Sequence, residues 1–165
     1  MSQQLNDRPA EIYGLVVPLD RERLLLPRGC VAEVIGYQTP QEMTGAPPWH
    51  LGVINWNGRK IPMVSFEGCC GAEVAPPSQR SRVVVLNAVS EAVEAGHIAI
   101  LSQGSPQLVR ISQEFVKLDA TRGFGDDSPV VCQLQLLDGT PLVPDLDRLE
   151  AMVAKETVTL PGDSV

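Results

Sequence analysis

The feature that most constrains the fold is the dipeptide Asn57-Gly58, which separates two short apolar runs in the segment His50–Val64. Asn-Gly suits the two positive-φ positions of a type I′ turn, the turn that joins the strands of a tight β-hairpin. The second run contains Pro62, which has no N–H to donate to a neighbouring strand. We therefore predict a hairpin here, with Pro62 at a sheet edge or beside a bulge.

The rest of the chain favours an all-β fold of one domain. Hydrophobic residues make up 44% of the 165 residues and aromatic ones 4%, so the core must consist mainly of aliphatic side chains. β-Branched runs punctuated by glycine and proline are typical of strands. Further strands are predicted at residues 12–19, 31–35, 83–86, 97–101 and 131–137.

A second turn, Asp138-Gly139, is also followed by a proline-containing strand, and this echo of the first hairpin predicts two small barrels side by side. We expect a polar arm over residues 1–10, one domain over 11–155 with its halves joined near 68–80, and a flexible tail over 156–165. Asp145 can cap a final helix. The apolar face of that helix comprises Leu146, Leu149, Met152 and Val153.

The charge of the chain argues against two classes of partner. Thirteen basic residues stand against 20 acidic ones, a net charge of −7, and the basic residues are scattered. Such a balance disfavours nucleic acid and anionic membrane surfaces. The polar start does not resemble a signal peptide, and no apolar run approaches the roughly 20 residues of a membrane span. We expect a cytoplasmic protein without direct membrane insertion.

No pattern of residues indicates catalysis, a metal or a cofactor. The four cysteines (Cys30, Cys69, Cys70 and Cys132) form no C-x-x-C pair. Motifs for a serine nucleophile, a phosphate-binding loop or a zinc protease are absent from the sequence. One enzymatic alternative stays open, a small thiol enzyme that uses Cys69 or Cys70.

Polar residues and a glycine inside predicted strands are the remaining candidates for function. Glu33 lies between Ala32 and Val34, and Asn55 follows Ile54. Gly52 could admit another backbone or a partner at close range. The alternative for each is structural: an outward face, an edge amide and a bulge.

Several of these segments resemble the CheW-like family, the coupling proteins of bacterial chemosensory arrays. Val31-x-Glu33-Val34 resembles the family's Val-x-Glu-Ile/Val strand. Pro47 through Asn55 resembles its Pro-x-x-x-x-Gly-Val-x-Asn segment, and Gly58-x-x-Ile61-Pro62-Met63-Val64 resembles its Gly-x-x-Ile/Leu-Pro-Val-Val strand. The resemblance spans residues 10–155.

The resemblance implies two five-stranded SH3-like barrels with a groove between them and a short C-terminal helix. It implies a scaffold, without enzymatic activity or cofactor, that binds the regulatory domain of a CheA-type histidine kinase and the tip of a methyl-accepting chemoreceptor. By position, the protein-binding residues would be Val31, Glu33, Val34, Gly52, Asn55, Asn57 and Gly58.

The chain departs from the family pattern at Asn57, where an arginine is usual, and at Ser65, where an aspartate is usual. Asparagine cannot replace the charge or reach of arginine. The departures suggest a divergent member, such as an accessory coupler of the ChpC type found beside type IV pilus systems for twitching motility. The alternative is a module that binds only the receptor or only the kinase.

Overall fold

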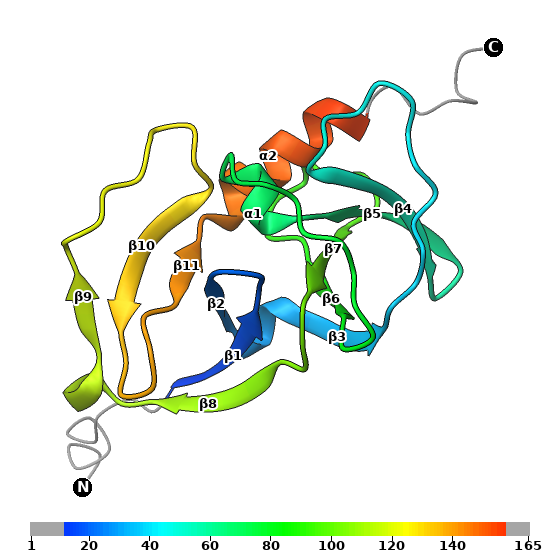
Figure 1. Ribbon diagram of the computed structural model, residues 1–165. Coiled ribbons are helices and arrows are strands. Elements are labelled where there is room, and N and C mark those ends of the chain that lie inside the picture. Colours follow the sequence, from blue (N-terminus) through cyan, green and yellow to red (C-terminus); the bar gives the residue numbers. More distant parts are fainter. Residues whose placement is uncertain (1–11, 158–165) are drawn as a thin grey trace, which may run out of the picture.

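The first of two β-sheets has six strands, in the order β8-β1-β2-β11-β10-β9 (Figure 1). The computed structural model describes residues 12–157. The strands of this sheet are β1 (Ile12–Pro18), β2 (Arg23–Pro27), β8 (Gln107–Ile111), β9 (Lys117–Asp119), β10 (Val130–Gln135) and β11 (Leu142–Pro144). Neighbouring strands run antiparallel except β2 and β11, which are parallel.

The second sheet has five strands, in the order β3-β6-β7-β5-β4. They are β3 (Val31–Gly36), β4 (His50–Trp56), β5 (Arg59–Val64), β6 (Arg82–Asn87) and β7 (His97–Ser102). Strands β6 and β7 pair antiparallel, and β5 runs parallel to β7. Short helical segments at Arg28–Cys30 (η2), Phe66–Cys69 (α1) and Gln113–Phe115 (η3) connect strands, and α2 (Leu146–Thr157) follows the last strand.

The predicted all-β fold with a short C-terminal helix is confirmed. In place of two five-stranded barrels the strands form sheets of six and five, and the chain divides between them differently from expectation. The segment 68–80 was expected to join the two halves, yet β5 before it and β6 after it belong to the same sheet. The six-stranded sheet instead combines β1 and β2 with β8 to β11. Strand β9 lies at the edge of this sheet, and its residues are mostly exposed, so the sequence shows no pattern of a buried strand there.

Pro62 does not lie on an edge strand as predicted, because β5 lies between β4 and β7. It pairs with Val53 of β4, whereas the pairing of β5 with β7 begins only at Met63, so at Pro62 that side of the strand is free. The opposing strand β4 has a register shift between His50 and Gly52, which is the predicted bulge.

Two apolar clusters form the core. The larger joins both sheets and α2, with Leu24 and Leu142 from the first sheet, Val84 from the second and Leu149 from the helix. Oδ1 of Asp145 accepts the N–H of Arg148 at 3.1 Å, which confirms the predicted helix cap.

The smaller cluster lies against the other face of the five-stranded sheet and includes Ile54, Ile61 and Val85. Aliphatic side chains dominate both clusters, as the low aromatic content predicts. Over residues 12–157, no helix is both long and apolar enough to cross a membrane.

Candidate protein-interaction surface

Strand β3 forms one edge of the five-stranded sheet and exposes most of its predicted site residues. Ala32, Glu33 and Val34 are all exposed, and the Val34 side chain is 40% accessible. An edge strand leaves one row of backbone N–H and C=O groups without ladder partners, so it can pair with another protein. The strand therefore offers both a backbone edge and an apolar side chain.

The three predicted residues of β3 divide between its two faces. Val34 pairs with Val84, which belongs to the cluster between the sheets, whereas Glu33 pairs with Val85 of the smaller cluster. Directly paired residues share a face of a sheet, so Val34 and Glu33 point to opposite sides. Val31 shares the side of Val34 but is half-buried and packs on the core.

Glu33 connects the two edges of the sheet. Its Oε2 accepts the indole N–H of Trp56 at 2.9 Å, and Trp56 ends the opposite edge strand β4. The Trp56 ring in turn lies 4.6 Å from the ring of His97, at an interplanar angle of 53°. This contact places the predicted β3 residues beside the β4–β5 hairpin, although the two lie far apart in sheet order.

Sequence reasoning did not identify Trp56 as a functional residue. The sequence drew attention only to the next residue, Asn57, as a departure from the family pattern. A signal was present in the sequence, because side chains alternate between the two faces of a strand, which puts Trp56 on the same face of β4 as Ile54. That face is also the one on which Glu33 lies.

The tip of the β4–β5 hairpin has the predicted turn. The φ angles are 49° at Asn57 and 75° at Gly58, as a type I′ turn requires. Asn55, Asn57 and Gly58 are exposed at this end of the sheet. Arg59 follows, also exposed and without an ion-pair partner among residues 12–157.

Gly52 is buried and has a structural role. Its φ is 134°, and a Cβ built on it would lie 2.2 Å from the backbone oxygen of Gln41. The N–H groups of Gln41 and Val53 each donate to the other residue's carbonyl, at 2.8 and 2.9 Å. The backbone that approaches Gly52 therefore belongs to this chain, and Gly52 contributes no surface to a partner.

Ser65 explains one departure from the family pattern. Its side chain is buried and accepts the N–H of Gly68 at 3.2 Å, so Ser65 is the N-cap of α1. Serine and aspartate are comparable N-cap residues. The substitution therefore preserves a local role and removes no exposed carboxylate.

The two candidate thiols lie in surroundings that oppose a nucleophilic role. Burial is the main cause that raises the pKa of Cys69 far above its usual range, and burial likewise raises the pKa of Cys70. A reactive cysteine requires a lowered pKa. No group of three or more His, Cys, Asp or Glu side chains gathers as a metal site within residues 12–157.

Comparisons with known protein families and solved structures agree with the fold. A crystal structure of the scaffolding protein TtCheW from Thermoanaerobacter tengcongensis matches with a TM-score of 0.69. The two sequences are 17% identical, and the match covers 85% of this chain and 88% of that one. No curated protein gave a significant sequence match. The family model described as "CheW-like domain" matches residues 13–149, and the chain therefore belongs to the CheW-like family.

Proposed function

We propose that this protein is a non-enzymatic coupling adaptor of a bacterial chemosensory pathway, acting in the cytoplasm at membrane-associated receptor arrays. Its partners in this proposal are the regulatory domain of a CheA-type histidine kinase and the hairpin tip of a methyl-accepting chemoreceptor. Membership of the CheW-like family supports the adaptor role. The raised thiol pKa values weigh against the thiol enzyme.

The observation that carries the proposal is the exposed edge strand β3, tied to the β4–β5 hairpin through the bond between Glu33 and Trp56. Val34 supplies apolar contact area on the side of the sheet that faces the larger apolar cluster. A few residues near the centre of an interface carry most of its binding energy. We therefore assign Val34 as the anchor, and Glu33, Asn55, Asn57 and Gly58 as its surroundings.

The test measures capture of a cognate receptor-tip fragment and a kinase regulatory domain by purified full-length protein. Val34→Arg should abolish receptor capture and leave the fold near native, because the side chain is already partly exposed. Val131→Arg is the matched control, since Val131 is 61% exposed on β10 of the other sheet. Val31→Asp would be less informative, because Val31 packs on the core.

Wild-type protein that captures neither partner would refute the adaptor role. Equal loss of capture by Val34→Arg and Val131→Arg would show that β3 is not the site. Both variants need an unchanged melting temperature for the comparison to count.

The uncharged turn residue Asn57 favours a more specialised member of the family. We propose an accessory coupler of the ChpC type, serving pilus-driven twitching motility, in which the Asn57 substitution weakens one partner interaction. Asn57→Arg should then strengthen capture of that partner while capture of the other stays constant. Equal capture of both partners by wild-type protein and Asn57→Arg would contradict this specialisation.

A further inference from the structure

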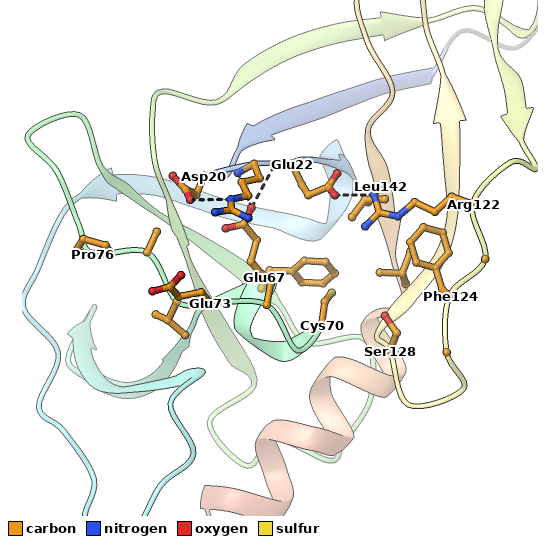
Figure 2. Close-up of a pocket in the computed structure, with 18 residues that line it drawn as sticks. Asp20, Glu22, Glu67, Cys70, Glu73, Pro76, Arg122, Phe124, Ser128 and Leu142 are labelled. Atoms are coloured by element: carbon orange, nitrogen blue, oxygen red, sulfur yellow. Dashed lines mark hydrogen bonds and ion pairs between the residues drawn. The ribbon is translucent and has the colours of Figure 1, made fainter.

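A pocket of about 620 Å³ opens away from the surface described above (Figure 2). Three segments line it: the turn between β1 and β2, helix α1 with the loop after it, and the loop that leads into β10. None of the residues proposed to bind the adaptor's partners lines this pocket. Its volume lies within the range of pockets that hold small ligands.

The most distinctive residue of the pocket is Glu67, a carboxylate on α1 that is only 8% exposed. Its Oε1 accepts the backbone N–H groups of Arg21 and Glu22 at 2.8 and 3.2 Å. The other oxygen, Oε2, has no hydrogen-bond partner among residues 12–157, and it is not sealed from solvent. Glu67 lines the pocket, and one acceptor oxygen of this nearly buried carboxylate remains unpaired within the described part of the chain.

Two arginines line the pocket, but each lies beside another carboxylate. Arg122 pairs with Glu22 at 2.6 Å, and its guanidinium lies 5.1 Å from the centre of the Phe124 ring. The Arg21 side chain is 83% exposed and lies 3.9 Å from Asp20. Neither forms an ion pair with Glu67, so no cation among residues 12–157 is paired with this carboxylate.

The remaining lining is largely apolar. Figure 2 shows Phe124 and Leu142 on one side of the pocket, and Pro76 and Glu73 on the other. Four acidic residues and two basic ones line it in all: Asp20, Glu22, Glu67 and Glu73 against Arg21 and Arg122. A carboxylate with apolar neighbours and excess negative charge suits a cation carried on an apolar stem.

We propose that this pocket binds an alkylammonium or guanidinium group, with Glu67 Oε2 accepting its N–H and the apolar wall covering its stem. A nearly buried carboxylate is more stable when it has both hydrogen bonds and a counter-charge. A ligand with these features would supply the donor and charge that the chain does not. The same group could arrive as a free amine or as a lysine or arginine side chain of a protein.

The proposal is tested by an NMR titration of the ¹⁵N-labelled full chain with agmatine, at constant ionic strength. We expect saturable shifts of backbone signals around Glu67, Cys70 and Phe124. Pentanol and pentanoate, of similar length but neutral and anionic, should bind at least about tenfold more weakly. Equal binding of pentanol, stronger binding of pentanoate, or no saturable binding of agmatine would overturn the proposal.

Three glutamine variants identify the carboxylate. Glu67→Gln keeps an oxygen for the two backbone N–H groups but removes the charge, so it should weaken agmatine binding about tenfold or more. Glu73→Gln removes an exposed charge of the pocket and should change binding far less. Equal effects of the two variants would show that a diffuse acidic field, and not Glu67, attracts the ligand.

Glu150→Gln is the matched control. Glu150 is 2% exposed and, like Glu67, accepts backbone N–H groups, here from Val89 and Ser90, but both of its oxygens have partners and it does not line the pocket. This variant should leave agmatine binding unchanged. The comparison of ligands on the wild-type chain decides the matter if Glu67→Gln does not fold.

A blocked peptide, acetyl-Ala-Lys-Ala-amide, separates the two sources of the cation. Binding of the peptide with the same shifts as agmatine would indicate a side chain presented by a protein. Binding of agmatine alone would indicate a free amine. Both results support the pocket chemistry.

Discussion

Replacing Gly52 with alanine tests the reasoning about β4 more sharply than any other change. The new Cβ would lie 2.2 Å from the backbone oxygen of Gln41, closer than real Cβ contacts, and Gly52 has a φ of 134°. The colliding atom of Gln41 belongs to the backbone, so it cannot move aside as the flexible end of a side chain could. The alanine can fit only if the segment around Gln41 moves away from β4.

The expected loss of stability follows from two terms. A non-glycine residue held in such a backbone conformation costs about 1–3 kcal/mol. Movement of Gln41 breaks the two hydrogen bonds that it shares with Val53, each worth about 1 kcal/mol. We therefore expect Gly52→Ala to lower the free energy of unfolding by about 3–5 kcal/mol, a large part of the about 5–15 kcal/mol of a typical domain.

Alanine variants at two other glycines near the same sheet distinguish the cost of backbone strain from the cost of the steric clash. Gly58 has a φ of 75° but open space around its Cβ position, so Gly58→Ala should cost only the left-handed strain, about 1–2 kcal/mol. Gly36 has neither feature, so Gly36→Ala should shift the free energy of unfolding by less than about 1 kcal/mol. Urea unfolding followed by circular dichroism measures all three.

The order of the three variants is the critical result. Gly52→Ala must be the least stable and Gly36→Ala the most stable. A Gly52→Ala protein as stable as Gly58→Ala would show that Gln41 does not approach β4 as closely as described. An unchanged stability of Gly58→Ala would show that Asn57-Gly58 is not a type I′ turn.

Two further residues give predictions of their own. Both ring nitrogens of His50 are buried without a partner among residues 12–157, so His50→Leu should raise the free energy of unfolding by about 1–2 kcal/mol at pH 7. Burial lowers the His50 pKa in the folded protein, so the unfolded chain binds a proton at a higher pH than the folded one. The free energy of unfolding should therefore fall as the pH drops below about 6.5, by at most about 1.4 kcal/mol per pH unit. The leucine variant should lack this His50 contribution to the pH dependence. Identical pH profiles of the two proteins in chemical denaturation would contradict this. Trp56→Phe keeps a ring near His97 but removes the N–H that donates to Glu33. The variant should lower the free energy of unfolding by less than about 1.5 kcal/mol and speed amide hydrogen exchange in β3. Exchange as slow as in the wild type would show that this bond does not hold the sheet edges together.

Local signals in the sequence predicted the local structure. The Asn57-Gly58 turn and the cap at Asp145 each depend on a few neighbouring residues, and both occur in the structure. The helix face also followed from spacing, because Leu149 and Val153 recur at the helical period and are fully buried.

Relations between distant strands were beyond such signals. The register shift between Val31 and Glu33 decides which side chains of β3 face the larger apolar cluster, and a bulge leaves no unique mark in the sequence. The bond from Trp56 to Glu33 depends on how far the sheet curls, which is set by all of its strands. The pocket around Glu67 likewise needs three segments that the sequence could not place together.

The division of the chain between the two sheets has a consequence for synthesis on the ribosome. All strands of the five-stranded sheet lie within residues 31–102, so that sheet can be completed while the C-terminal part of the chain is still being made. Strands β1 and β2 emerge before that sheet, yet their partners β8 and β11 emerge after it, since Ile12 pairs with Ile111 and Leu24 with Leu142. Until then β1 and β2 form a two-stranded ribbon, which is at best marginally stable in water. The nascent chain thus carries an apolar hairpin ahead of a finished sheet, and early termination anywhere before β8 would leave that hairpin as an exposed, aggregation-prone edge.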